Sequence, residues 1–109
     1  MRAEVFSEEL VYGIKEVLAS QALSIILYGS VARGEAGEES DVDVAVIVKG
    51  RLSEDAQDKL SDFIVDMNLK YETVFSVIDI DNQEFEKWEN VSPFYKNVKK
   101  DGVVLWKAA

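Results

Sequence analysis

Two short apolar runs constrain the fold of this chain more than any other feature. Residues 22–28 form an apolar run that Gly29 ends, and residues 42–48 alternate and are rich in the β-branched residue valine. Runs of this length and composition are typical of buried β-strands. Because segments with helical periodicity lie on both sides of the pair, we predict an α/β (α+β) domain with one mixed sheet of about four strands flanked by helices.

The rest of the chain divides into helices and strands by the same reasoning. Ser7 and Ser53 are suitable N-cap residues, each followed by acidic residues and an apolar stripe at helical spacing. Pro93 after Ser92 starts a further helix, because proline is favoured at the first helical position. The predicted order is helix 7–19, strand 22–28, strand 42–48, helix 53–69, strand 73–80, helix 82–89, a helix from Pro93 to a C-cap at Gly102, and strand 103–106.

The composition limits the chemistry that the chain can perform. It has 109 residues, 48% of them hydrophobic, so we expect one globular domain over residues 1–109. Cysteine and histidine are both absent, which excludes disulfides, thiolate metal sites, the usual zinc ligands and Ser-His-Asp catalysis. Any metal would therefore be a hard cation held by oxygen, typically Mg²⁺.

Charge and hydropathy indicate the compartment of the protein and the classes of ligand that it can bind. A formal net charge of −9 disfavours a long nucleic acid as ligand, because such ligands are held mainly by Lys and Arg. The same charge suits a basic partner or an acidic metal-binding cleft. No apolar run reaches the ~20 residues of a membrane helix and no signal-peptide pattern is present, so we expect a cytoplasmic protein without membrane contact. The oligomeric state stays open, a homo-oligomer included.

Asp41 and Asp43 straddle a single valine at the start of the second predicted strand. Side chains in a strand alternate between faces, so the two carboxylates point one way while Val42 and Val44 point the other way, toward the core. Neighbouring carboxylates repel each other unless a cation lies between them, and Mg²⁺ binds one or two carboxylates in this manner. By itself, an Asp-x-Asp pair is more often a solvated junction of loop and strand.

Gly29 and Ser30 form the turn that follows the first predicted strand. A glycine lets a phosphate approach the backbone closely, the Ser30 hydroxyl can donate to a phosphate oxygen, and Arg33 matches phosphate geometry. A plain strand-to-helix turn with Ser30 as N-cap is the ordinary alternative. Together, a phosphate-holding turn and a carboxylate pair on neighbouring strands predict a metal–nucleotide site, where catalysis is positioning plus charge stabilisation.

At these residues the chain resembles the minimal nucleotidyltransferases (MNT) of the DNA polymerase beta superfamily. The signature of that family is a Gly-Ser turn followed by Ser-Asp-x-Asp on the next strand. It is matched by Gly29-Ser30-Val31-Ala32-Arg33-Gly34 and by Ser40-Asp41-Val42-Asp43. The segment SPFYKNVKKDGVVLW, residues 92–106, also resembles the C-terminal end of several small prokaryotic members. The resemblance covers most of the chain and implies a single nucleotidyltransferase domain over residues 1–109.

The resemblance also implies an activity and partners. It implies Mg²⁺-dependent transfer of a nucleoside monophosphate from a nucleoside triphosphate such as ATP to an acceptor hydroxyl. Asp41 and Asp43 would be the catalytic metal ligands, and Ser30 would hold the outer phosphates. Small members commonly pair with a helical HEPN-type protein, and in some pairs the nucleotidyltransferase is an antitoxin that modifies or covers a toxic ribonuclease. The alternative is a non-catalytic or weakly catalytic antitoxin-like subunit that neutralises such a partner by contact.

Family members usually carry a third carboxylate on a later strand, and here that position falls on Ser76 within the segment VFSVIDID. Asp79 and Asp81 follow closely, but strand parity puts them on the face opposite to Ser76. Glu72 has the parity of Ser76 but lies further back along the chain. A shifted carboxylate, a weakly bound second metal, and nucleotide binding without catalysis all stay open.

Aromatic residues gather in the last quarter of the chain, at Trp88, Phe94, Tyr95 and Trp106. Core and lid packing is their ordinary role, and a partner surface is the functional alternative. Lysines 96, 99 and 100 lie toward the end of the last predicted helix, where the helix dipole favours cations. We expect a solvated helix end there, with triphosphate binding as the alternative.

Overall fold

The computed structural model describes residues 3–34 and 41–109, which contain four strands and five α-helices. In chain order the elements are α1 (Ala3–Leu18), β1 (Ala22–Tyr28), α2 (Gly29–Ala32), β2 (Val42–Val48), α3 (Glu54–Tyr71), β3 (Phe75–Asp81), α4 (Asn82–Trp88), α5 (Pro93–Asp101) and β4 (Val103–Lys107). A 3₁₀ turn over Ala19–Gln21 joins α1 to β1. The predicted order of helices and strands is confirmed. The short α2 lies where the sequence allowed a strand-to-helix turn, and it begins at Gly29, whereas the 3₁₀ turn was not predicted.

The four strands form one mixed sheet in the order β3-β2-β1-β4. β1 runs antiparallel to both of its neighbours, β2 and β4, whereas β2 and β3 run parallel to each other. Parallel neighbours need a long crossover connection, and α3 supplies it. The predicted fold class, an α/β domain with one mixed four-stranded sheet, is therefore confirmed.

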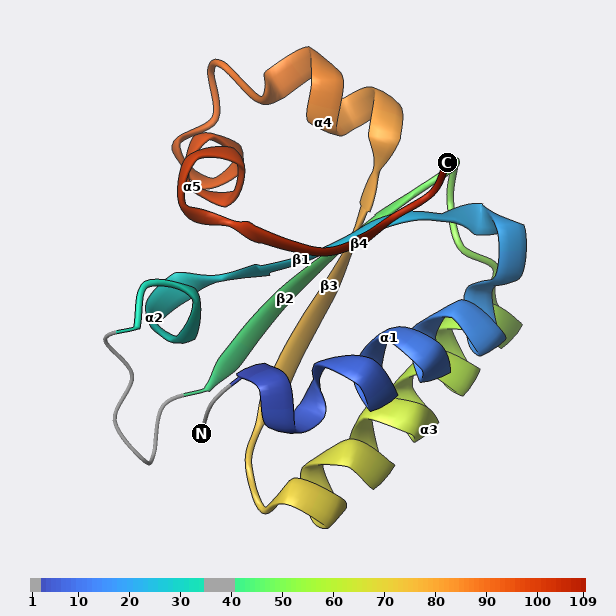
Figure 1. Ribbon diagram of the computed structural model, residues 1–109. Helices are drawn as coiled ribbons and strands as arrows, with labels where there is room; N and C mark the ends of the chain where they lie inside the picture. The colour runs from blue at the N-terminus through green and yellow to red at the C-terminus, as the bar shows by residue number, and fades with distance from the viewer. Residues whose placement is uncertain (1–2, 35–40) are drawn as a thin grey trace.

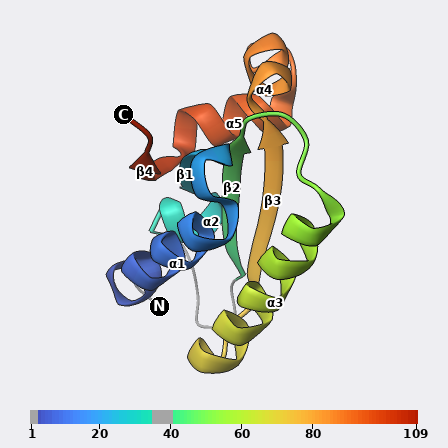
Figure 2. The ribbon, with the colours of Figure 1, turned by 90° about the vertical axis from the view of Figure 1, so that its right-hand side faces the viewer.

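Helices cover both faces of the sheet (Figures 1 and 2). α1 and α3 lie on one face, and α4 and α5 lie on the other. On the first face, the predicted valine stripe of β2 is buried with residues of α1 and α3, such as Phe6 and Met67. On the second face, Ala45 and Ile47 of β2 pack with Val98 of α5. β2 is thus buried on both faces, which explains why its sequence is almost continuously apolar.

Three predicted boundaries are wrong, and one of them is the end of α3, which reaches Tyr71 instead of residue 69. α1 begins at Ala3, and the Ser7 hydroxyl donates a hydrogen bond to the Ala3 carbonyl instead of capping the helix. Phe6 is fully buried, so the apolar stripe of this helix starts before the predicted cap. β3 begins later than predicted, at Phe75, because Glu72 first ends α3 in the left-handed conformation with a φ of 51°.

Other predicted helix ends are confirmed. Ser53 Oγ accepts a hydrogen bond from a backbone N–H in the first turn of α3 at 3.1 Å, and Ser92 Oγ does the same for α5 at 3.4 Å. Pro93 is the first residue of α5, and Gly102 is its C-cap. These helix ends depend on hydrogen bonds between residues close in the chain, so the sequence pattern predicts them directly.

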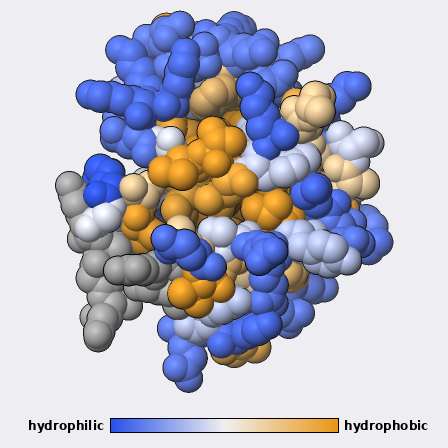
Figure 3. Space-filling model, viewed as in Figure 1, coloured by the Kyte–Doolittle hydropathy of each residue, from blue (hydrophilic) through white to orange (hydrophobic). Residues whose placement is uncertain are grey.

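An apolar surface lies over β4, bordered by hydrophilic surface from the neighbouring helices (Figure 3). β4 is an edge strand of the sheet, and its Val103 and Val104 side chains are exposed. Across the described parts of the chain, none of the helices combines the length and apolar character needed to cross a bilayer.

Candidate active site

A glycine turn at the end of β1 forms one side of the candidate site. β1 ends at Tyr28, and Gly29 follows with a φ of +77°. Glycine adopts this left-handed conformation more readily than any other residue, so the chain can turn here directly into α2. The Gly29 carbonyl accepts a hydrogen bond from the Arg33 N–H at 3.2 Å. Ser30 therefore stands in the first turn of α2, next to the end of β1.

The carboxylate of Asp43 lies against this turn. A Cβ atom at position 29 would lie 2.4 Å from Oδ2 of Asp43, which is far inside van der Waals contact. The absent side chain of Gly29 therefore leaves the space that the Asp43 carboxylate occupies. The turn and the carboxylate that the sequence singled out meet at this point.

Strand pairing explains how Asp43 reaches the turn. Tyr28 of β1 is paired with Asp43 of β2, so the residue before Gly29 is a direct neighbour of the carboxylate. On its other side, Asp43 is paired with Ser76 of β3. Asp43 is half-buried, whereas Asp41, just before the start of β2, is exposed. The two carboxylates and the glycine turn are thus brought together at one end of the sheet.

The electrostatics of this point are those of an acidic pair beside an arginine. Burial raises the pKa of the Asp43 carboxyl above its ordinary value, the charge of Asp41 raises that pKa further, and the charge of Arg33 acts in the opposite direction. Burial also raises the pKa of the Tyr28 hydroxyl, and the charge of Asp43 adds to this effect. A cation beside the two carboxylates would relieve their repulsion, and a donor set made only of oxygens fits Mg²⁺.

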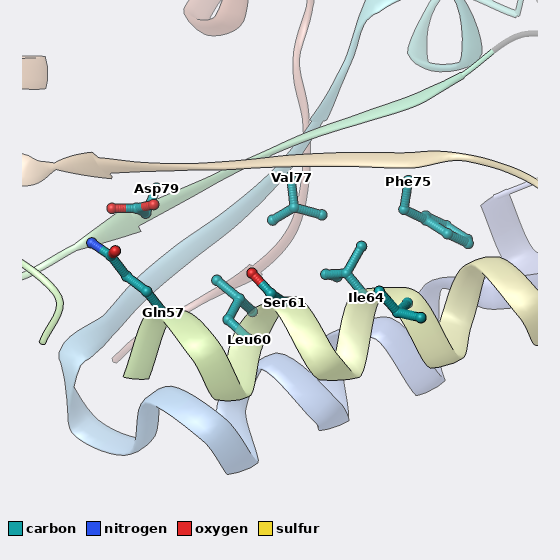
Figure 4. Close-up of a pocket in the computed structure, with 8 residues that line it drawn as sticks. Gln57, Leu60, Ser61, Ile64, Phe75, Val77 and Asp79 are labelled. Atoms are coloured by element: carbon teal, nitrogen blue, oxygen red, sulfur yellow. The ribbon is translucent and has the colours of Figure 1, made fainter. Parts of the chain in front are cut away.

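The candidates for a third carboxylate are separated from this pair. The β3 neighbour of Asp43 is Ser76. Asp79 lines a groove on the opposite face, beside α3, and its carboxylate lies near side chains of that helix (Figure 4). Asp81 is the N-cap of α4, and Glu72 is the C-cap of α3. Within residues 3–34 and 41–109, no three acidic side chains are grouped so that they could hold a metal ion.

The sequence reasoning missed one residue of the site, Tyr28. The usable signal was its place directly before the Gly29-Ser30 turn in the sequence. Its packing with Ile26 and Ala45, on the face that carries Asp43, is seen only in the structure. Arg33, which was predicted, caps the C-terminal end of α2 and is exposed. The serine at position 40, which opens the predicted Ser-Asp-x-Asp signature, lies outside the described residues.

The lysines and aromatic residues of the last quarter have mixed roles. The three lysines of α5 are exposed, and Lys99 forms an ion pair with Glu89 at 3.1 Å, as at a solvated helix end. Tyr95 and Trp106 are partly buried and pack against the two apolar clusters, which agrees with the core role. Phe94, by contrast, is 41% exposed.

The protein is a small α/β domain whose four-stranded mixed sheet brings a glycine–serine turn beside a carboxylate pair. A family model described as "Nucleotidyltransferase domain" matches residues 11–105 of this chain. The chain belongs to this nucleotidyltransferase family, as the signature residues predicted.

Individual relatives agree with this assignment. The Methanocaldococcus jannaschii protein named "Putative protein adenylyltransferase MJ0604" is 33% identical over 106 residues, which is 97% of this chain and 100% of that protein. Two solved complexes share the fold at lower identity. One, a toxin–antitoxin with AMP-PNP, is 20% identical with a TM-score of 0.59, covering 93% of this chain and 73% of that one. The other, a tri-AMPylated Shewanella oneidensis HEPN toxin with MNT antitoxin, is 16% identical with a TM-score of 0.59, covering 96% and 72%.

Proposed function

We propose that this chain is a Mg²⁺-dependent nucleotidyltransferase that transfers a nucleoside monophosphate from a nucleoside triphosphate to a hydroxyl group on a partner protein. One observation carries the proposal. The Asp43 carboxylate occupies the space left by the absent side chain of Gly29. A turn that could bind phosphate therefore lies directly beside a carboxylate that could bind a metal ion. Transfer at phosphorus depends mainly on such positioning and on charge stabilisation.

Each residue at this point has a role in the proposed reaction. Asp41 and Asp43 would hold Mg²⁺ through carboxylate oxygens. Gly29 leaves room for the Asp43 carboxylate, and the Ser30 hydroxyl donates a hydrogen bond to an outer phosphate oxygen. Arg33 adds a positive charge that acts on Asp43. When bound, Mg²⁺ neutralises negative charge on the phosphate oxygens and so favours attack at phosphorus.

The reaction exchanges one P–O bond for another. The acceptor hydroxyl oxygen bonds to the α-phosphorus, the bond from that phosphorus to the bridging oxygen breaks, and pyrophosphate leaves with the electron pair. Ser76 stands beside Asp43 where the family resemblance places a third carboxylate, and a serine hydroxyl is a poor proton acceptor. We expect the acceptor proton to pass to solvent and transfer to be slow.

Relatives support the choice of donor and acceptor. The M. jannaschii relative carries the name of a protein adenylyltransferase, which favours ATP as donor and a protein as acceptor. The structural neighbours include an antitoxin in complex with a tri-AMPylated HEPN toxin, which favours a HEPN-type helical partner. A net charge of −9 suits a basic protein better than a long nucleic acid.

The test is transfer of labelled nucleotide. The purified chain would be incubated with α-³²P-ATP, with and without Mg²⁺, together with a co-expressed HEPN-type partner. We expect label on the partner with the wild-type chain and Mg²⁺, and none with the Asp41→Asn/Asp43→Asn double variant. Asp79→Asn is the matched control, because Asp79 is a carboxylate on the opposite face of the sheet and should not affect labelling.

Two results would contradict this proposal. The first is an absence of labelling, with Mg²⁺ present, on the partner and on the chain itself. The second is equal labelling by the wild-type chain and the double variant, which would place the chemistry elsewhere.

The second candidate function is an antitoxin-like binding subunit that neutralises a HEPN-type partner by contact. Ser76 at the position of the third carboxylate favours it, because it leaves the metal site with two carboxylates in the described structure. In this case the Asp41→Asn/Asp43→Asn variant would still protect cells from the partner although no nucleotide is transferred. Loss of protection together with labelling in this variant would refute neutralisation by contact alone.

A further inference from the structure

A row of aromatic rings leads away from the candidate active site, past the first turn of α5, to α4. The Tyr28 ring meets the Phe94 ring edge-on, with 5.6 Å between their centroids. Phe94 lies 5.8 Å from Tyr95, and Tyr95 lies 5.5 Å from Phe85 of α4. Four rings are therefore in successive contact.

This row lies on the face of the sheet that carries Asp43. Tyr28 and Tyr95 pack against the same apolar cluster as Ala45, and Ala45 has the strand parity of Asp43. Tyr28 is also the strand partner of Asp43, and α5 lies against α2 at this end of the sheet (Figure 1). The row therefore begins beside the carboxylates, passes the first turn of α5 and ends at α4.

Phe94 is the ring of this row that is most open to a ligand. Phe94 is 41% exposed. The other three aromatic residues are partly buried against the apolar cluster that contains Ala45 and Val98. Contacts with the Tyr28 ring and with the Tyr95 ring restrict the position of the Phe94 ring. An exposed aromatic ring near a phosphate site has the chemistry of a stacking surface for a nucleobase.

We propose that Phe94 is the stacking platform for the base of the bound nucleoside triphosphate. This inference rests on the proposed function, because the position of the phosphates sets the direction of the nucleotide. With the phosphates at Ser30 and Asp43, the sugar passes along Tyr28 and the base lies on Phe94. The β3 side of Asp43, at Ser76, is then left for the acceptor. Every base has a π-face, so Phe94 contributes affinity and does not select the base.

Binding without turnover tests this assignment. The dissociation constant of α,β-methylene-ATP with Mg²⁺ would be measured by calorimetry for the wild-type chain and for Phe94→Leu, Phe94→Ala and Phe94→Trp. Loss of base stacking should weaken binding by about 5- to 150-fold in the Leu and Ala variants. Phe94→Trp should bind at least as tightly as the wild-type chain. α,β-Methylene-GTP should show the same pattern.

Inorganic triphosphate with Mg²⁺ is the matched control ligand, because it has no base. It should bind all four proteins alike. Val91→Ala is the matched control variant, since Val91 is an exposed apolar residue of the same region that is not part of the aromatic row. It should leave nucleotide binding unchanged.

Each other outcome has a definite meaning. If Phe94→Ala and Phe94→Leu bind the ATP analogue like the wild-type chain, the base does not stack on Phe94, and loss of partner binding instead would make Phe94 a protein contact. Equal losses for the analogue and for triphosphate would overturn the proposal, because they would mean a disturbed turn. Binding of neither ligand by the wild-type chain would refute the proposed function itself.

Photolabelling gives a measurement that needs no variant. Ultraviolet irradiation of the wild-type chain with 8-azido-ATP and Mg²⁺, followed by peptide mapping, should place the label within Pro93–Asp101. Excess ATP should prevent this labelling. A label confined to β3 or α3 would place the base on the other side of Asp43 and would overturn the proposal.

Discussion

Gly29→Ala tests whether the glycine turn and the Asp43 carboxylate depend on each other. An alanine held at a φ of +77° lies in the left-handed region, which costs about 1–2 kcal/mol for an L-residue. Since Tm changes by about 4 °C per kcal/mol in a domain of this size, the variant should lose roughly 4–8 °C. The new Cβ would also lie 2.4 Å from Oδ2 of Asp43. Because that oxygen is the end of a side chain, we expect the carboxylate to move.

Gly50→Ala is the matched control for this variant. Gly50 has a similar φ, +74°, but no heavy atom of the described residues lies within 4 Å of the Cβ that it would gain. Thermal unfolding followed by circular dichroism should therefore show similar losses of Tm in both variants. Only Gly29→Ala should weaken the binding of Mg²⁺ and α,β-methylene-ATP in calorimetry. We expect a loss of about tenfold or more, because an interaction with a charged group contributes ~1.5–3 kcal/mol.

Two results would refute this reasoning. Nucleotide binding by Gly29→Ala at the wild-type level would show that the Asp43 carboxylate does not need the space above the glycine. Equal losses of binding in Gly29→Ala and Gly50→Ala would show that general destabilisation, rather than the contact with Asp43, governs nucleotide affinity.

Three further predictions follow from other parts of the structure. Ser76→Asp adds a carboxylate beside Asp43, so it should cost about 0.2–1 kcal/mol without Mg²⁺ by cross-strand repulsion, and Mg²⁺ should raise its Tm more than that of the wild-type chain. The uncharged Ser76→Asn should show neither effect. Phe6→Ala removes a fully buried ring and should lower the free energy of unfolding in urea by about 3–5 kcal/mol; a loss below about 1 kcal/mol would contradict the packing seen here. A hydrogen bond from Lys70 lowers the pKa of the Glu9 carboxyl. A lowered folded-state pKa contributes stability above the ordinary pKa of glutamate, and that stability is lost as pH falls through the lowered value. Urea unfolding between about pH 6 and pH 3 should therefore depend more steeply on pH in the wild-type chain than in Glu9→Gln.

The elements of this fold could be predicted because their signals are local. The strands Ala22–Tyr28 and Val42–Val48 were predicted with their observed bounds, from apolar runs that end at turn residues. Ser53 and Ser92 cap helices through bonds to backbone groups a few residues away. The start of α1 was missed for a related reason. Ser7 has the residue type of an N-cap, but its hydroxyl bonds back to Ala3 within the helix, and residue type does not distinguish the two roles.

The candidate site could be predicted in its residues but not in its arrangement. Strand parity places Asp41 and Asp43 on one face, and the glycine turn precedes them in the chain. Parity alone did not reveal that this face is also covered by helices, with Ala45 buried beside the site. It also did not identify the neighbours of the carboxylates, because strand order is a property of the whole sheet.

The sequence by itself determined the order of helices and strands, the restriction of any metal to a hard cation held by oxygen, and the family signature. These depend on residue type and on spacing along the chain. Only the tertiary structure decided that the Asp43 carboxylate fits into the space above Gly29. It also decided that Tyr28 and Ser76 are the strand neighbours of Asp43, and that the Phe94 ring contacts the Tyr28 ring. The physical reason is that strand register and helix docking depend on contacts between residues far apart in the chain, which no local pattern records.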